Sequence, residues 1–223
     1  QRAAAAKDDG TLAAIVEGTF QKLVVLGFFP LMLLTLVGRE LFVIVFGANW
    51  AEAGVYVQIL SPWTFFWLVS APFGTLFSVL ERQEFGLAIE AVIIVTRFAS
   101  LLVGGWLDSA RLGLLLFSVS GVVVYGYLSL TIMAAGGVPY RKTIGILGTN
   151  LARFVPAGST LLVLKALGAH PVLQVATFGM LLGIYGLFVL KTDQQLRQAV
   201  GQFGDWRRLV GRVSKTRGHD ANA

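Results

Sequence analysis

Three charged side chains lie within long apolar stretches, where a charge is costly and therefore marks a candidate functional site. Glu90 and Arg97 are seven residues apart, which places both on one face of a helix. Arg153 lies in a later apolar stretch. The two arginines could attract an anionic head group, and Glu90 could balance Arg97 or carry a proton. The structural alternative is an internal ion pair, or an arginine that extends towards the lipid head groups.

Four prolines also lie within apolar stretches, namely Pro30, Pro62, Pro72 and Pro156. Each removes a backbone hydrogen bond and predicts a helix kink. Kinked helices are common in transporters because they allow bending. Fixed curvature for packing is the simpler explanation for any one of them, whereas the set favours moving helices.

The remaining residues argue against enzymatic chemistry. The sequence has no cysteine, so disulfides and thiolate metal sites are excluded, and its two histidines form no metal-binding pattern. It contains no P-loop, nucleophile elbow or zinc-protease motif. We therefore expect no catalytic residue, no metal, no cofactor and no nucleic-acid partner.

The composition indicates that these residues sit in membrane-spanning helices. The chain of 223 residues is 56% hydrophobic and 13% charged, against about 25% charged in a typical soluble domain. A bilayer needs about 20 apolar residues per helix. The sequence predicts an all-α, polytopic fold with six transmembrane helices arranged as antiparallel hairpins, because the connections are short. The predicted spans are 23–46, 54–80, 84–107, 111–135, 143–167 and 171–190.

The span 54–80 is unusually rich in aromatic side chains, most of which we expect to face lipid. It also carries a row of small residues, typical of close packing against another helix. These small residues are Ser61, Ser70, Gly74 and Ser78.

The distribution of basic residues predicts the orientation. Thirteen of the 18 Lys and Arg residues fall on one side, and three fall on the other, namely Arg39, Arg111 and Lys165. By the positive-inside rule the first side is cytoplasmic, so both ends of the chain are expected in the cytoplasm. Residues 1–22 are predicted as an interfacial amphipathic segment that feeds into the first span. Residues 191–223 are predicted as a basic amphipathic cytoplasmic tail.

The stretch from Leu41 to Gln83 has the pattern LFxxVFGxxWxxAGxYxxILSPWxFFxxxSxPxxxLFxVLxRQ. This pattern resembles the polysaccharide transporter family, the O-antigen and exopolysaccharide repeat-unit flippases. The family belongs to the multidrug/oligosaccharidyl-lipid/polysaccharide exporter superfamily. The resemblance is dense over about 45 residues and identifies a fold better than a substrate.

The resemblance implies a two-lobed flippase of 12–14 spans, of which this chain would be the C-terminal portion. Residues 23–135 would supply four helices of the C-terminal lobe, and residues 136–190 a terminal helix pair. The implied substrate is an undecaprenyl-pyrophosphate-linked oligosaccharide, moved across the bacterial inner membrane by alternating access. Implied partners are membrane lipids, the missing N-terminal lobe, and polysaccharide polymerase and assembly proteins. The portion alone would be inactive.

Two other functions remain open. A drug or cation antiporter of the same superfamily would favour an acidic cavity, whereas the predicted spans show two arginines against one glutamate. A membrane-bound polysaccharide polymerase would favour large outer loops, whereas the outer loops here are only a few residues long.

Overall fold

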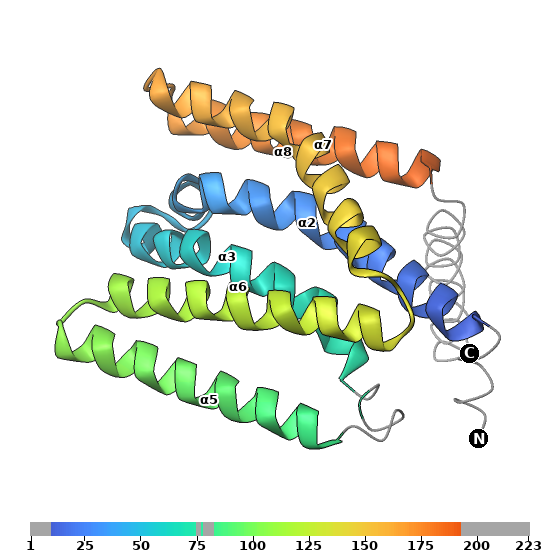
Figure 1. The fold of residues 1–223 in the computed structure, drawn as a ribbon. Coiled ribbons are helices and arrows are strands. Elements are labelled where there is room, and N and C mark those ends of the chain that lie inside the picture. Colours follow the sequence, from blue (N-terminus) through green and yellow to red (C-terminus); the bar gives the residue numbers. More distant parts are fainter. Residues whose placement is uncertain (1–9, 75–76, 78–82, 193–223) are drawn as a thin grey trace, which may run out of the picture. The chain divides into compact units, whose positions relative to one another are not determined.

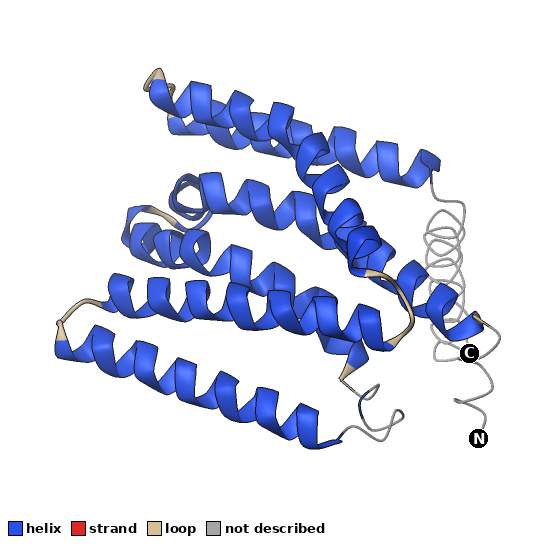
Figure 2. Ribbon diagram, in the orientation of Figure 1, coloured by secondary structure: helices blue, strands red, loops and turns tan. Residues whose placement is uncertain are grey.

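The computed structural model describes residues 10–74, 77 and 83–192, and every element of secondary structure in those ranges is helical (Figures 1 and 2). Five helices are long and apolar enough to cross a membrane, which indicates an all-helical, multi-pass membrane protein. These five are α2 (Thr11–Phe46), α5 (Gln83–Trp106), α6 (Ala110–Ala135), α7 (Tyr140–Ala166) and α8 (Pro171–Thr192). A shorter helix, α3 (Ala51–Ser70), and the 3₁₀ turns η1 (Ala48–Trp50) and η2 (Ala71–Phe73) lie between α2 and α5.

Short polar and glycine-containing turns end the helices. Helix α2 stops at Gly47, whose φ of 98° is readily adopted only by glycine, and whose N–H still bonds to the Val43 carbonyl. Helix α6 begins after Ser109, whose hydroxyl accepts a hydrogen bond from the Leu112 N–H. It is followed by Gly137 at φ 90° and then by Pro139. These are local signals, which is why the helix ends lie close to the predicted span ends.

The predicted span 54–80 differs from the observed helix. Helix α3 ends at Ser70 and continues as the 3₁₀ turn η2, which contains Pro72. Pro72 has no N–H to donate to the carbonyl four residues earlier, which favours the tighter 3₁₀ turn at this position. Because α3 is not among the five apolar helices, the arrangement of six spans remains a prediction.

Helix α2 covers two predicted segments without interruption. Its 36 residues include the end of the predicted interfacial segment 1–22 and the whole predicted span 23–46. Residues 11–22 therefore continue without a break into the predicted span, whereas residues 1–9 of the predicted interfacial segment lie outside the described residues.

Close backbone approaches set two antiparallel helix pairs. Helices α2 and α3 cross at Gly38 and Gly54, where neither residue has a side chain to separate the backbones. Helices α5 and α6 approach in the same way at Gly104 and Gly113, and they lie side by side in Figure 1. Small residues at both crossings allow the dense packing that holds helices together in lipid.

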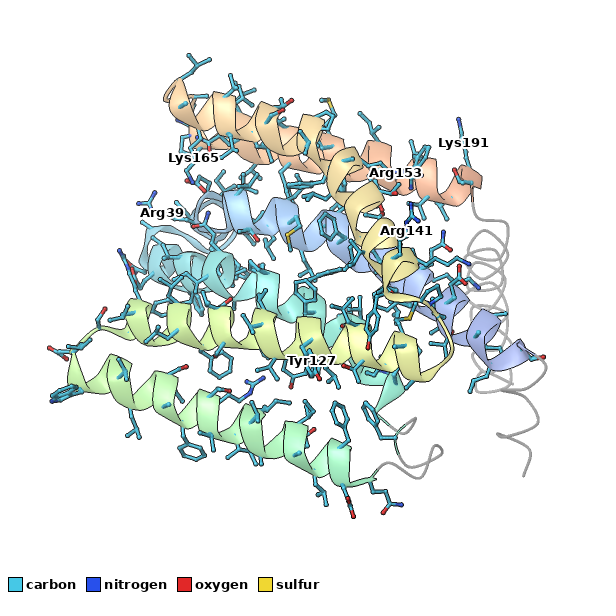
Figure 3. All side chains as sticks on the ribbon, viewed as in Figure 1. Arg39, Tyr127, Arg141, Arg153, Lys165 and Lys191 are labelled. Carbon is cyan, nitrogen blue, oxygen red and sulfur yellow. The ribbon has the colours of Figure 1, made fainter. Side chains whose placement is uncertain are left out.

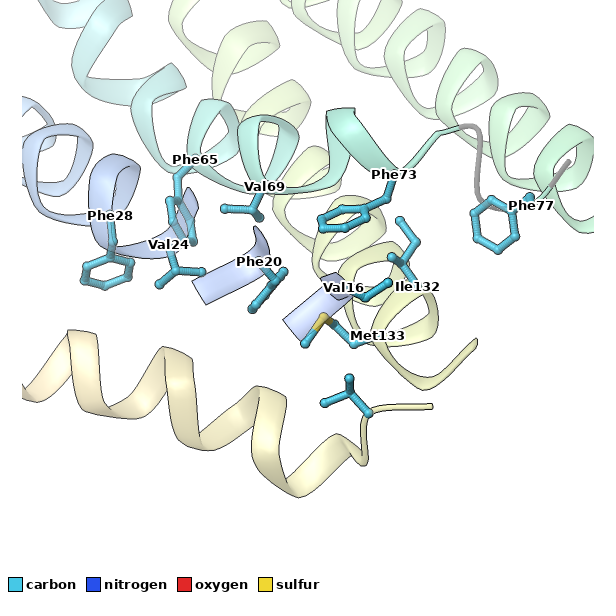
Figure 4. Packing of buried hydrophobic residues seen from close by; sticks show 11 residues of the cluster. Val16, Phe20, Val24, Phe28, Phe65, Val69, Phe73, Phe77, Ile132 and Met133 are labelled. Atoms are coloured by element: carbon cyan, nitrogen blue, oxygen red, sulfur yellow. The ribbon is translucent and has the colours of Figure 1, made fainter. Parts of the chain in front are cut away.

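A buried apolar cluster joins α2, α3 and α6 (Figure 4). Phe65 of α3 is fully buried in it and meets Phe28 of α2 edge to face at 5.0 Å. The expectation that most aromatics of 54–80 face lipid is therefore wrong for Phe65, Phe73 and Phe77, which are buried, whereas Trp67 is 46% exposed. The cluster comprises Val16, Phe20, Val24, Phe28, Phe65, Val69, Phe73, Phe77, Ile132, Met133 and Val138.

The chain divides into two compact units, residues 1–179 and 180–223, with the boundary inside α8. The second unit is described only over Met180–Thr192, the C-terminal part of that helix. The predicted amphipathic tail beyond Thr192 lies outside the described residues.

A charged pair links the first turns of α3 and α6. The guanidinium of Arg111 donates two hydrogen bonds to the Glu52 carboxylate, Nε to Oε1 at 2.7 Å and Nη2 to Oε2 at 2.5 Å. This bidentate bond holds the pKa of Glu52 below its usual range. Because only the carboxylate form accepts both bonds, the link is present above the pKa of Glu52 and is lost as the pH falls through it.

Replacing Arg111 with glutamine is therefore expected to raise the pKa of Glu52 towards that of an ordinary glutamate. The effect on folding stability should be small because both side chains are exposed. NMR titration of a ¹³C-labelled Glu52 carboxyl would measure the pKa in both proteins. An unchanged Glu52 pKa in R111Q would show that the bidentate bond is not formed in the membrane-bound protein.

Candidate functional site

Arg97 lies in the middle of α5, and its guanidinium is surrounded by aromatic rings from α3 and α6. The guanidinium carbon is 4.3 Å from the ring centroid of Phe117, 4.8 Å from Trp63 and 5.8 Å from Tyr125. Its Nη2 also donates to the Tyr125 hydroxyl at 3.4 Å. We call Trp63, Phe117 and Tyr125 the aromatic cage. Ring faces within about 6 Å attract a cation, so the cage holds the charged end of Arg97 against the helices.

Glycine on α6 makes room for the cage. The indole of Trp63 lies directly over Gly121, and any Cβ at that position would collide with the ring. The indole also meets Phe117 edge to face at 5.1 Å. Within the described residues the buried Nε1 of Trp63 has no hydrogen-bond partner, so the indole contacts Arg97 through its ring face.

The positive charge of Arg97 is not balanced by a carboxylate within the described residues. The ion pairs there are Arg111–Glu52, Lys142–Glu17 and Lys165–Glu40. The cage rings stabilise the guanidinium, but they carry no net charge and do not neutralise it. Arg97 therefore remains a cation that can attract an anion.

Glu90, seven residues before Arg97 on α5, has different surroundings. It lines a cavity of about 420 Å³ at which α3, α5 and α6 meet. Close to this cavity the hydroxyls of Ser70 and Ser129 are 2.9 Å apart and tie α3 to α6. The lining residues are Ser70, Gly74, Phe77, Gln83, Gly86, Leu87, Ile89, Glu90, Leu128 and Ile132. Since Arg97 is not one of them, Glu90 and Arg97 share a helix face without sharing a site.

Arg153 is placed on a different packing surface from Arg97. It is an exposed residue of α7, whereas its neighbour Phe154 turns inward to meet Phe28 and Phe29 of α2 at 6.0 and 5.9 Å (Figure 3). Helix α7 packs chiefly on α2, and α5 packs on α6. The structure thus does not bring the two arginines together around one ligand.

The four prolines fall into two groups. Pro30, Pro62 and Pro156 lie inside α2, α3 and α7 respectively. Pro72 lies in the 3₁₀ turn η2 rather than inside an α-helix.

Two features of the site were not foreseen from the sequence. The residues of the aromatic cage lie 20 to 34 positions from Arg97 along the chain, and no local sequence pattern predicts their contact with it. Glu40 lies inside the predicted span 23–46 and is only 6% exposed, yet it was not counted among the charges of the spans. Its position in an apolar run was the signal that could have identified it.

The described ranges contain no group of three His, Cys, Asp or Glu side chains that could hold a metal ion. What they offer is a caged cation and a cavity with one carboxylate in its lining. No protein-family model, curated protein or solved structure matches the chain significantly.

Proposed function

We propose that this chain takes part in flipping undecaprenyl-pyrophosphate-linked oligosaccharide units across the bacterial cytoplasmic membrane. The observation that carries the proposal is Arg97, a guanidinium held among apolar helices with no carboxylate partner in the described residues. A pyrophosphate group carries the complementary charge and accepts strong hydrogen bonds from arginine. The resemblance of Leu41–Gln83 to repeat-unit flippases points to the same substrate.

The proposed mechanism is alternating access without covalent chemistry. Arg97 would attract the pyrophosphate, and the helices that contain Pro30 and Pro62 would bend as the site changes sides. The end of α7 that carries Arg141 and Lys142 would face the cytoplasm. The proposed partners are membrane lipids, an N-terminal lobe of the same protein, and polysaccharide assembly proteins.

Reconstitution tests this proposal. The protein would be placed in vesicles that contain a fluorescent undecaprenyl-pyrophosphate oligosaccharide, and a membrane-impermeant quencher would report how much lipid has changed leaflet. Accelerated movement compared with protein-free vesicles is expected. If the lipid stays in its leaflet while the protein is folded and correctly inserted, the proposal is wrong.

A second candidate function, export of organic cations, is favoured by the cavity beside Glu90. Among the described residues that line it are one carboxylate and no basic side chain. A carboxylate next to apolar walls suits an amphipathic cation, for which Arg97 would be repulsive. The two functions therefore depend on opposite charges of the same helix.

Replacing Glu90 with glutamine distinguishes them. A flippase is expected to keep its rate of lipid movement, because Glu90 neither contacts the aromatic cage nor pairs with Arg97. A cation exporter is expected to lose at least tenfold of its substrate affinity, since a charge-assisted contact is worth about 1.5–3 kcal/mol and about 1.4 kcal/mol is tenfold. Both substrates would be assayed in the same vesicles. The matched control is E84Q, because Glu84 is an exposed carboxylate of α5 that does not line the cavity.

A further inference from the structure

Glu40 is a buried carboxylate that the proposed function does not use. It lies near the C-terminal end of α2 and is 6% exposed. One carboxylate oxygen, Oε1, is 3.3 Å from the Nζ of Lys165 on α7. The other, Oε2, is buried and has no hydrogen-bond partner in the part of the chain that the structure describes. An ionised carboxylate in such a place is costly, because one of its oxygens has lost water without gaining a donor.

Lys165 is only partly engaged by the Glu40 carboxylate. Its side chain is 45% exposed, and its Nζ also donates to the Leu36 carbonyl at 3.1 Å. The same carbonyl accepts a second bond, from Gln58 Nε2 of α3 at 2.9 Å. The ammonium can therefore turn to water or lipid head groups when Glu40 no longer attracts it. Leu36 and Glu40 thus form one junction of α2, α3 and α7.

A second ion pair joins the opposite ends of the same two helices. Lys142 Nζ is 2.7 Å from Glu17 Oε2, and each residue lies 23 positions before its counterpart in the Lys165–Glu40 pair. Helices α2 and α7 consequently run parallel and are tied at both ends. The Glu17 side chain is 24% exposed, whereas that of Glu40 is 7% exposed, so only the Glu40 end withholds water from the carboxylate.

We propose that Glu40 is a proton-binding site whose occupancy controls the contact between α2 and α7. A proton from bulk water forms an O–H bond at Oε2, and the carboxylate charge changes from −1 to zero. Lys165 then loses its counter-ion and turns outward, which releases this end of α7. The Glu17–Lys142 pair remains as the fixed end, so α7 pivots instead of separating. The contact is closed while Glu40 is ionised and opens when Glu40 is protonated.

The other titratable or charged groups at this end of the packed helices are Arg39 on α2, Glu52 and Tyr56 on α3, Asp108 before α6, Arg111 on α6 and His170 after α7. Glu52 and Arg111 are paired with each other. Arg39 and His170 are exposed. None of these groups forms an ion pair with Glu40 in the described residues, so Lys165 is the partner that the test must follow.

Distance measurements between spin labels test the proposal directly. The chain has no cysteine, so two introduced cysteines label it at chosen points only. Val45→Cys and Val163→Cys place labels on exposed positions of α2 and α7 near Glu40 and Lys165. In vesicles, acidification is expected to lengthen or broaden the distance distribution. E40Q, which mimics the protonated side chain, is expected to show the acidic distribution already at neutral pH and no further change in acid.

The matched control uses labels at the fixed end, Ile15→Cys and Ile144→Cys, where E40Q should leave the distribution unchanged at neutral pH. Infrared difference spectra of the protein without introduced cysteines give an independent readout. Acidification is expected to produce the C=O band of a protonated carboxyl group, and E17Q is expected to retain this band. K165Q should also adopt the open distribution at neutral pH. A distribution insensitive to pH overturns the proposal. So does a response to sodium at fixed pH with none to protons, which would assign the buried oxygen to a metal cation.

Discussion

Replacing Arg97 with glutamine is expected to reduce the rate of lipid movement by about tenfold to a hundredfold. The change removes both the cation proposed to attract the pyrophosphate and its contact with the aromatic cage. A charge-assisted hydrogen bond is worth about 1.5–3 kcal/mol, and about 1.4 kcal/mol corresponds to tenfold. The rate would be measured with the quencher assay in vesicles with matched amounts of inserted protein.

Two variants separate the role of the charge from the role of the shape. R97K keeps a cation that can sit over the cage rings but loses the planar fork of the guanidinium, so an intermediate rate is expected. R141Q removes one exposed positive charge from the first turn of α7 and is the matched control, with a rate near that of the unmodified protein. If R97Q moves lipid as fast as R141Q does, Arg97 is a structural residue of the cage and not a substrate contact.

A large effect on folding is expected from Gly54→Ala at the crossing of α2 and α3. A Cβ at Gly54 would lie 2.6 Å from the Arg39 Cα and 2.7 Å from the Gly38 carbonyl oxygen. Both are backbone atoms, so no side-chain rotation relieves the clash and the helices must separate. We expect a loss of about 1–3 kcal/mol in the free energy of unfolding, the usual cost of overpacking.

Gly18→Ala, on α2, is expected to change the free energy of unfolding in the opposite direction. A Cβ at Gly18 would meet nothing within 4 Å, so this variant should gain up to about 1 kcal/mol from helix propensity. Reversible unfolding of both variants in mixed detergent micelles would measure the difference. Equal stability of G54A and the unmodified protein would mean that α2 and α3 do not approach this closely in the membrane.

Local sequence was sufficient for the helices and their ends. Apolar runs of about 20 residues, interrupted by Gly47, Ser109 and Gly137, predict helices over nearly the observed ranges, because hydropathy, capping and backbone freedom act within a few residues. The exception is 54–80, where the run stays apolar past Ser70 while Pro72 alters the backbone. Hydropathy averages over a window and does not register a change of hydrogen-bond pattern at one residue.

The charged residues show what only the tertiary structure decided. The sequence by itself determined that Glu90, Arg97 and Arg153 lie within apolar helices, and it predicted one shared site. The structure distributes them over a cavity, an aromatic cage and the exposed side of α7. It also buries Glu40 beside Lys165, which is 125 residues away in the chain. Hydropathy measures how much a side chain avoids water, and an apolar side chain avoids water equally well against lipid or against protein. Hydropathy therefore does not say which helices pack together, and the partner of each charge depends on that packing.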